Sequence, residues 1–259
     1  MSLKTLDNAL ELLEYFKKKP SWGVRELAKE MGFSLTVTHR LLTTFKNHSY
    51  LILDPESQRY ELGLKFLEFG FLTMDTLKFR DLVFPNMEKL ARETDETIFL
   101  TWLDGYEGLS IAIAESSQSI KFAFEVGTRK PLHSAASNRI ILAYLPEDEQ
   151  NQILSGKLER LTNQTITDPE GIKKGLLEMR EQGWGCTLGE TTTDVVGIAV
   201  PLFDYTNRII GSLTVAGPVY RIPKEKETEI LALLLKEKEI IQNNINKLGL
   251  TYSQIKKCL

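Results

Sequence analysis

The apolar positions between residues 24 and 47 repeat with the spacing of two short amphipathic helices. In the first helix they fall at i, i+3, i+4 and i+7, at Val24, Leu27, Ala28 and Met31. Gly32 follows and can take the positive φ that ends a helix, and Ser34 can cap the next one. The apolar stripe of the second helix consists of Val37, Leu41, Leu42 and Phe45. The pattern predicts a helix-turn-helix.

The other face of the second helix carries small hydroxyls, an amide and cations, which suit base edges and phosphates in a DNA major groove. The candidate DNA contacts on this segment are Ser34, Thr36, Thr38, His39, Arg40, Thr43, Lys46 and Asn47. Two amphipathic helices joined at a glycine also occur in ordinary helical bundles. Taken alone, the segment leaves DNA binding and a bundle both open.

The flanking segments favour DNA binding. A helix is expected over Thr5–Lys18, with an apolar stripe at Leu6, Leu10, Leu13 and Phe16. Two β-prone runs, Tyr50–Leu53 and Arg59–Leu62, surround a polar turn and predict a hairpin. Three helices followed by a hairpin describe a winged helix. The candidate DNA contacts on the wing are Ser57, Gln58 and Arg59, although the hairpin tip can also be an ordinary surface turn.

The segment Leu64–Leu77 is apolar on nearly every side, so a helix there needs a packing partner. A linker helix that packs on a second copy of the chain would form a homodimer and fix the spacing of two recognition helices. Burial within its own chain is the alternative. We expect a DNA-binding domain over residues 1–62, a linker and dimerisation helix over 63–79, and a second domain over 80–259.

The second domain alternates β-prone runs with helical ones, which predicts an α+β module with an antiparallel sheet. The expected helices are Asp81–Glu93, Ala135–Tyr144, Glu170–Gln182 and Lys224–Leu248. Pro85 should lie in a first turn or impose a kink. The expected strands are Thr97–Leu103, Leu109–Ala114, Ile120–Val126, Val196–Phe203 and Ile209–Ala216.

Charge and composition narrow the function. The net charge is −3, and the first 70 residues carry ten Lys and Arg against nine Asp and Glu, so DNA binding must depend on a few well-placed cations. No apolar run is long enough to cross a bilayer, and the N-terminus lacks the pattern of a signal peptide, so we expect a cytoplasmic protein. Cys186 and Cys258 are far apart and the chain has three histidines, which predicts no metal site and no cofactor.

The order of these segments resembles the IclR-type bacterial transcriptional regulators over nearly the whole chain. The matching segments are RELAKEMGFSLTVTHRLLTTF, YELG, TIFLTWLDG, PLHSAAS, QGWGCTLGE, GIAVPLFD and LTVAGPVYRI. The resemblance implies a winged helix, a dimerising linker helix and a C-terminal domain of GAF-like fold that binds a small metabolite, often a carboxylate. It also implies dimers that can pair into tetramers on double-stranded operator DNA. Activators and repressors both occur in the family.

The resemblance places the effector pocket between PLHSAAS and the last two strands. The residues expected there are Leu132, Ala135, Ala136, Glu190, Val195, Gly197, Thr214 and Ala216. A free backbone amide at the start of the helix at Ala135 could bind a carboxylate, because helix N-termini favour anions. After PLHSAA, members often carry Gly-Lys-Ala, where this chain has Ser137, Asn138 and Arg139. In the recognition helix, Leu35 replaces a small polar residue that many members carry.

Two other functions remain as alternatives. In a small-molecule-processing enzyme, His133 and Ser134 would supply a base and a nucleophile, with Glu190 or Asp194 as a third member. Adjacent side chains on a strand point to opposite faces, which disfavours such a triad, and a structural histidine is expected. A winged helix that binds protein would need exposed apolar anchors in place of the hydroxyls and cations of the second helix. A turnover assay and a gel shift would separate these alternatives.

Overall fold

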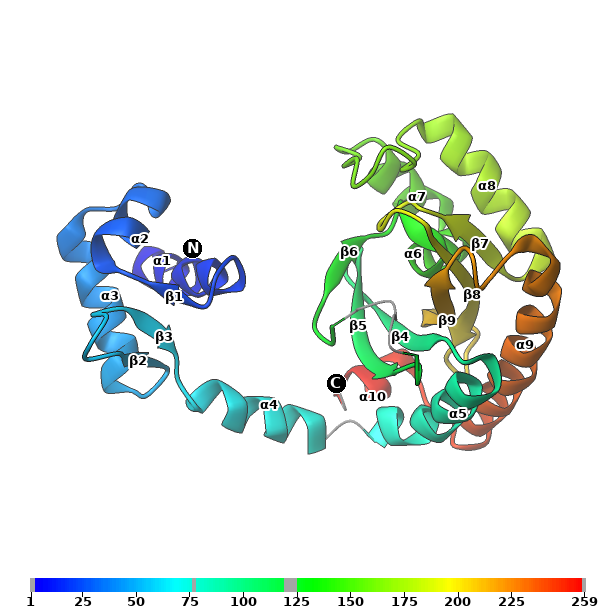
Figure 1. Ribbon diagram of the computed structural model, residues 1–259, viewed down its shortest axis with the longest axis horizontal. Coiled ribbons are helices and arrows are strands. Elements are labelled where there is room, and N and C mark those ends of the chain that lie inside the picture. Colours follow the sequence, from blue (N-terminus) through cyan, green and yellow to red (C-terminus); the bar gives the residue numbers. More distant parts are fainter. Residues whose placement is uncertain (1–2, 76–77, 119–124, 258–259) are drawn as a thin grey trace. The chain divides into compact units, whose positions relative to one another are not determined.

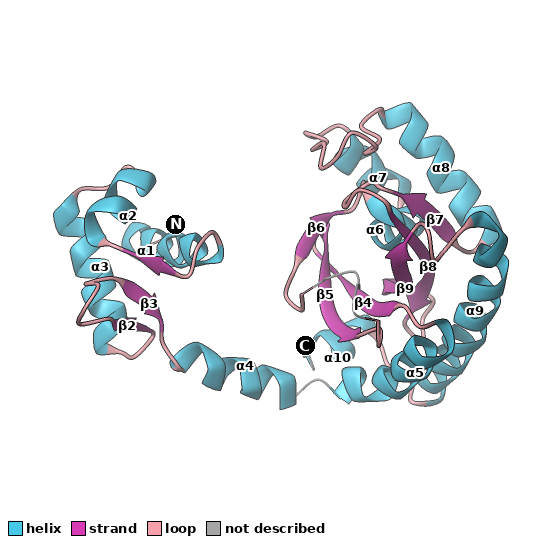
Figure 2. Cartoon of the chain, in the orientation of Figure 1, coloured by secondary structure: helices cyan, strands magenta, loops and turns pink. Residues whose placement is uncertain are grey.

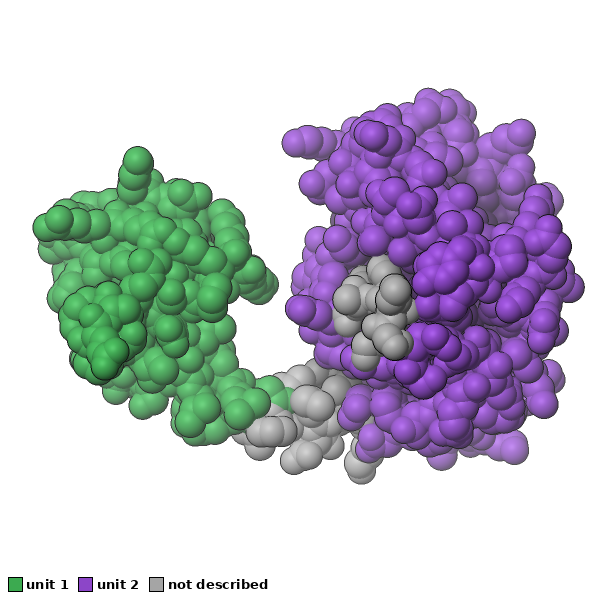
Figure 3. Space-filling view, in the orientation of Figure 1, with its two compact units in different colours: residues 1–76 green, residues 77–259 purple. Residues whose placement is uncertain are grey.

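The computed structural model describes residues 3–75, 78–118 and 125–257. The chain divides into two compact units, residues 1–76 and 77–259 (Figure 3). The boundaries expected from the sequence, at 62/63 and 79/80, stay predictions. The first unit contains α1 (Lys4–Glu14), a 3₁₀ turn (Tyr15–Lys17), β1 (Ser21–Trp22), α2 (Val24–Met31), α3 (Leu35–Asn47), β2 (Leu51–Leu53), β3 (Tyr60–Leu62) and α4 (Lys65–Asp75).

The first unit is the winged helix that the sequence predicts. Strands β2 and β3 pair antiparallel from Leu51 opposite Leu62 to Leu53 opposite Tyr60, and β1 adds a third strand on the other side of β3. The strand β1 is only two residues long and was not predicted, because so short a run has no periodicity. The core of the unit joins α1, α2, α3 and the sheet through Leu12, Phe16, Trp22, Leu27, Met31, Leu41, Leu42, Leu51 and Tyr60.

Two helix faces differ from the expectation by one position. In α1 the buried side chain is Leu12, whereas Leu6 and Leu10 are more than half exposed. In α3, Thr38 is buried together with the predicted Leu41 and Leu42, whereas Val37 is 40% exposed. Thr38 tolerates burial because its hydroxyl donates to the carbonyl of Ser34, 3.2 Å away. The sequence pattern therefore locates the buried face of a helix only to within about one residue.

The second unit is one antiparallel sheet with helices on both faces (Figures 1 and 2). Its helices are α5 (Lys78–Thr94), α6 (Ala135–Tyr144), α7 (Glu147–Leu154), α8 (Pro169–Gln182), α9 (Lys224–Lys247) and α10 (Tyr252–Lys257). Its strands are β4 (Thr97–Asp104), β5 (Glu107–Ala114), β6 (Arg129–Pro131), β7 (Gly185–Leu188), β8 (Val195–Phe203) and β9 (Ile209–Pro218). The strand order is β6-β5-β4-β9-β8-β7, and this arrangement confirms the predicted α+β class.

The two faces of this sheet have separate cores. On one face α5 and α9 cover alternate residues of β4, β8 and β9, such as Leu100, Ile198 and Leu213. On the other face α6 and α8 pack over Ala199 and neighbouring positions. Side chains alternate across a strand, so the residues of β4, β8 and β9 that lie between those covered by α5 and α9 face α6. They include Phe99, Gly197 and Thr214.

Some elements of the second unit were not predicted. The strands β6 and β7 and the helices α7 and α10 are short, and β7 lies in a glycine-rich segment typical of a loop. Of the strand expected over Ile120–Val126, residues 120–124 lie outside the described residues, and Glu125 and Val126 are not in a strand. Pro85 lies inside α5, well beyond the first turn.

Candidate functional site

The first candidate site is the exposed face of α3, the recognition helix of the helix-turn-helix. Gly32 has a φ of 67° and ends α2, and the N–H of Phe33 returns to the carbonyl of Ala28. Ser34 then caps α3, because its hydroxyl accepts from the N–H of Val37 at 3.3 Å. This turn is built from local bonds alone, as the sequence indicates.

Most of the predicted DNA contacts on α3 lie at its surface. Those that are exposed are Ser34, Thr36, His39, Arg40, Lys46 and Asn47, and Thr43 is half-buried. Among the described residues, no carboxylate lies within ion-pair distance of the Arg40 guanidinium, which leaves this group available for DNA. The prediction for Thr38 is wrong: its side chain is fully buried on the inner side of α3, so it cannot contact DNA.

The tip of the wing is shaped by Asp54. Its carboxylate accepts hydrogen bonds from the N–H of Glu56 and from the N–H and the hydroxyl of Ser57. The bond from the Ser57 hydroxyl is the main cause that lowers the pKa of Asp54. Gln58 follows with a φ of 55°. Ser57 and Gln58 are exposed at this tip, where they could meet a DNA backbone.

Arg59 has a structural role that the sequence did not suggest. Its guanidinium donates to the hydroxyl and the carbonyl of Ser21, at 2.9 and 3.0 Å, and to the carboxylate of Glu26 at 2.7 Å. Hydrogen bonds from Lys19 and Arg59 lower the pKa of Glu26. Arg59 therefore ties the hairpin to β1 and α2, and its role as a DNA contact on the wing stays a prediction.

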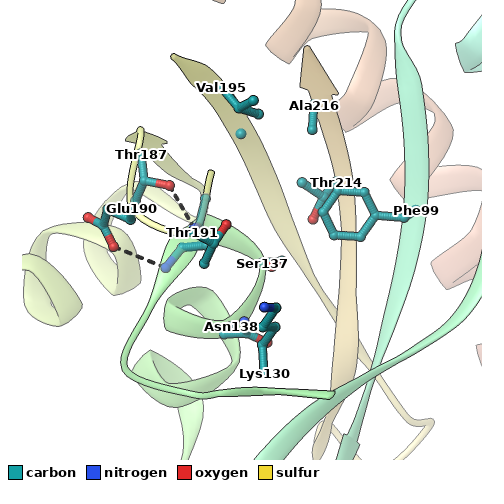
Figure 4. A pocket seen from close by; sticks show the side chains of 13 residues that line it. Phe99, Lys130, Ser137, Asn138, Thr187, Glu190, Thr191, Val195, Thr214 and Ala216 are labelled. Carbon is teal, nitrogen blue, oxygen red and sulfur yellow. Dashed lines mark hydrogen bonds between the residues drawn. The ribbon is translucent and has the colours of Figure 1, made fainter. Parts of the chain in front are cut away.

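The second candidate site is a pocket between α6 and the sheet of the second unit, and it is partly open to solvent (Figure 4). The residues that line it are Phe99, Lys130, Ala135, Ala136, Ser137, Asn138, Thr187, Glu190, Thr191, Val195, Gly197, Thr214 and Ala216. Of the residues expected from the resemblance, Leu132 alone does not line the pocket. It is fully buried in the core beneath α6, directly after strand β6.

The N-terminus of α6 is closed by the protein's own side chains, which corrects the prediction of a free amide. The N–H of Ala135 donates to the carboxylate of Glu190 at 3.0 Å, and the N–H of Ala136 donates to the hydroxyl of Thr187 at 2.9 Å (Figure 4). Ala135 has a φ of 63°, a conformation that is strained for a residue with a side chain. Strain of this kind is typical of functional sites.

Glu190 also forms a buried ion pair with Arg139. The second carboxylate oxygen lies 2.8 Å from Nη1 of Arg139, and the two side chains are 6% and 5% exposed. Burial raises the pKa of Glu190, although the charge of Arg139 and the N–H of Ala135 oppose this shift. Burial likewise lowers the pKa of Arg139. Nε of Arg139 donates to the carbonyl of His133 at 2.9 Å, which fixes the guanidinium under α6.

Six lining residues were not among those expected from the resemblance: Phe99, Lys130, Ser137, Asn138, Thr187 and Thr191. Phe99 pairs with Thr214 across β4 and β9, so strand register brings it to the pocket. Lys130 lies on the unpredicted strand β6. Buried side-chain atoms without a hydrogen-bond partner among the described residues include Oγ1 of Thr214 and Oδ1 of Asn138.

The residues of the alternative enzyme do not assemble. Nε2 of His133 donates to the carbonyl of Glu159 at 3.0 Å, and the hydroxyl of Ser134 donates to the carbonyl of Pro131. His133 is therefore a bonded structural residue, and it does not bond to Ser134. Burial raises the pKa of the Cys186 thiol to about 12, which leaves it protonated at neutral pH. In residues 3–75, 78–118 and 125–257, no cluster of three or more His, Cys, Asp or Glu could hold a metal ion.

Family models match both units. The model of the IclR helix-turn-helix domain matches residues 5–55, and the model of the bacterial transcriptional regulator IclR C-terminal domain matches residues 71–242. The chain belongs to the IclR family of bacterial transcriptional regulators. It is 32% identical over 224 residues to the HTH-type transcriptional regulator KipR of Bacillus subtilis, which covers 86% of this chain and 89% of that protein.

Solved structures of the family have the same fold. The IclR of Thermotoga maritima, 27% identical, has a TM-score of 0.74 and covers 95% of this chain and 100% of that one. An IclR homologue from Microbacterium hydrocarbonoxydans, complexed with 4-hydroxybenzoate, has a TM-score of 0.81 over 94% of this chain and 99% of that one. At 20% identity the latter likeness shows the fold alone. No helix within the described part of this IclR-family chain is long and apolar enough to span a membrane.

Proposed function

We propose that this protein is a transcriptional regulator whose affinity for its operator changes when a small organic acid binds in the pocket between α6 and the sheet. The observation that carries the proposal is the pocket itself, because its lining includes the buried hydroxyl of Thr214, which has no hydrogen-bond partner among the described residues. A buried polar atom without a partner is costly, and a ligand that bonds to it removes that cost. A homologue of the same fold is complexed with 4-hydroxybenzoate, a small organic acid, which supports a ligand of this class.

The DNA contacts of this regulator lie on α3 and the wing tip. Thr36, Arg40 and Asn47 share the face opposite the buried stripe, where a recognition helix meets base edges. Lys46 flanks that face and binds phosphate, and Ser57 and Gln58 meet the backbone from the wing. Arg40 is the permanent charge at the centre of this face.

The regulator acts as a homodimer, and its dimers can pair into tetramers. Leu64 and Leu67, at the start of the linker, are 76% and 53% exposed in a single chain. Large apolar side chains on adjacent turns favour association with a second copy. Two recognition helices then meet two half-sites of one operator, which compensates for the small net charge of the first unit. The protein works in the cytoplasm, where its operator is.

The ligand and the operator are coupled through the stability of two arrangements of the dimer. A ligand shifts operator affinity only if it binds one arrangement better than the other, and a difference of about 1–3 kcal/mol gives a usable switch. The linker helix connects the unit that holds the pocket to the unit that binds DNA. Its packing is therefore where the two arrangements would differ.

A gel shift with the DNA upstream of the protein's own gene, and with sequences selected from a random pool, tests this function. We expect selective retention of one DNA sequence and a change in its apparent Kd when a small acid is added. If no sequence is enriched from the pool, DNA regulation is excluded. A turnover assay on the same acids addresses the enzyme alternative, and product formation by purified protein would contradict the proposal.

A further inference from the structure

Lys130 is a half-buried cation that lines the effector pocket and has no carboxylate partner among the described residues. It lies on β6, opposite Gly108 of β5, at the edge of the sheet. No ion pair or hydrogen bond joins its ammonium to another described residue. An ammonium group that loses part of its water without gaining an anion is unfavourable, so the pocket favours a ligand that supplies one.

The other charges around the pocket are already matched. Glu190 is the one acidic residue among the described lining residues, and its carboxylate is bonded to Nη1 of Arg139 and to the N–H of Ala135. Lys130 and Glu190 come from different segments and form no ion pair with each other. The pocket therefore has one uncompensated positive charge, which belongs to Lys130.

The N-terminus of α6 is a poor position for a ligand carboxylate in this chain. A carboxylate that binds the N–H of Ala135 must displace Glu190 and would leave it beside the incoming charge. A carboxylate at Ala136 must displace the hydroxyl of Thr187. Separating Glu190 from Arg139 would also leave a buried charge without its partner, which is strongly unfavourable.

We infer that the acid ligand does not use the N-terminus of α6. Its carboxylate binds the ammonium of Lys130, and a polar group of the ligand binds the hydroxyl of Thr214. In Figure 4 the ring of Phe99 and the side chain of Thr214 lie between Lys130 at one end of the pocket and Val195 at the other. Phe99 forms an apolar wall for the body of the ligand. The ligand class is a small carboxylic acid that also carries a hydroxyl or carbonyl group.

This inference rests on the proposed function, since it names the anchor and the class of the ligand of that pocket. It predicts that binding requires the negative charge of the ligand and the positive charge at position 130. A primary amide has the shape of the acid without its charge, so it should not bind. Lys130→Arg should keep binding, because it preserves the charge and the donors.

The test is calorimetry and thermal unfolding of the full-length protein with matched pairs of compounds. The acids are 4-hydroxybenzoate, lactate and gluconate, each compared with its primary amide. Lys130→Met removes the charge and keeps most of the side chain, and Lys174→Met is the control, an exposed lysine of α8 outside the pocket. The unfolding midpoint without ligand shows that each variant folds.

We expect at least one acid to raise the unfolding midpoint of the wild type and of Lys174→Met, and its amide to have no effect. Lys130→Met should weaken that acid about tenfold or more, as the loss of a charge-assisted hydrogen bond does. If an acid binds wild type and Lys130→Met equally, or if acid and amide bind equally, Lys130 is not the anchor of the carboxylate. Either result would overturn this inference without contradicting the proposed regulator. If no acid binds the wild type, the acid ligand of the proposed function fails together with its anchor.

Discussion

The carboxylate of Glu190 lies 3.0 Å from the backbone nitrogen of Ala135, so the N-terminus of α6 is capped by a residue 55 positions further along the chain. Glu190 thereby occupies the position where the family resemblance had suggested a ligand carboxylate. Its other oxygen holds Arg139. The pair is therefore part of the frame of the pocket, and the proposed acid ligand would need a charge partner other than Arg139.

Glu190→Ala should destabilise the second unit by about 3–5 kcal/mol, because it leaves the guanidinium of Arg139 buried without a charge partner. Glu190→Gln should cost less, since its amide oxygen can still accept from the N–H of Ala135. Denaturant unfolding of both variants measures the difference. Equal, small losses for the two variants would show that the ion pair does not contribute to stability.

Arg40→Ala should abolish sequence-specific DNA binding without changing the oligomeric state. Arg40 is exposed at the centre of the α3 face, and removing it takes away the guanidinium best placed for base edges. A gel shift with a selected operator measures the effect, and light scattering checks the oligomer. Lys174→Ala is the control for loss of one charge. Unchanged operator affinity in Arg40→Ala would contradict the assignment of α3 as the recognition helix.

Lys46→Ala should weaken binding to all DNA sequences alike and flatten the dependence of log K on log salt by about one phosphate contact per protomer. Arg59→Ala should act differently, because Arg59 joins the wing to Ser21 and Glu26. We expect it to lower the unfolding free energy of the first unit. Titrations at several salt concentrations, together with thermal unfolding, separate the two effects. An Arg59 variant of full stability with a reduced salt slope would instead support the phosphate contact predicted from the sequence.

Leu67→Glu should dissociate the oligomer. Leu67 is 53% exposed on α4 of a single chain, and a carboxylate there would be buried against the second copy if α4 forms the interface. Light scattering or sedimentation measures the mass. Glu68→Gln, on the same helix, is the control, because Glu68 is exposed and pairs with Lys65. An intact oligomer in Leu67→Glu would exclude the linker helix as the dimer contact.

Asp204→Asn should destabilise the second unit relative to wild type. This loss of stability should be larger at neutral pH than at acidic pH. Burial pushes the pKa of Asp204 up, but bonds donated by Thr206, Arg208 and Tyr252 outweigh this and hold the pKa below its ordinary 3.8. The stabilisation is therefore present above pH 3.8 and is lost as pH falls through the lower pKa of the folded state.

We expect Asp204→Asn to cost about 1–3 kcal/mol at pH 7, as for a hydrogen bond to a charged group, and progressively less as the wild-type carboxylate takes up its proton. Denaturant unfolding across this pH range measures the difference. A cost that does not change with pH would show that the charge of Asp204 contributes nothing.

The sequence by itself determined the elements whose ends depend on neighbouring residues. Gly32 ends α2 with a positive φ, and Ser34 caps α3, within three positions of each other. Asp168 caps α8 by accepting from the N–H of Gly171, and Gly183 ends that helix. The bonds of a turn or a cap join residues only a few positions apart, so the local sequence contains all of their partners.

Tertiary structure decided which side chains meet in the pocket and which face of a helix is buried. Phe99 reaches the pocket because β4 pairs with β9 in the register that places it opposite Thr214. Val37 and Thr38 exchange their expected roles because a helical period fixes a buried face only to within one residue, and packing selects between the two. Lys130 and Glu190 acquire their roles from partners, or the lack of partners, that lie far along the chain. Contacts of that kind exist only after the sheet has formed, because it is the pairing of distant strands that brings such residues together.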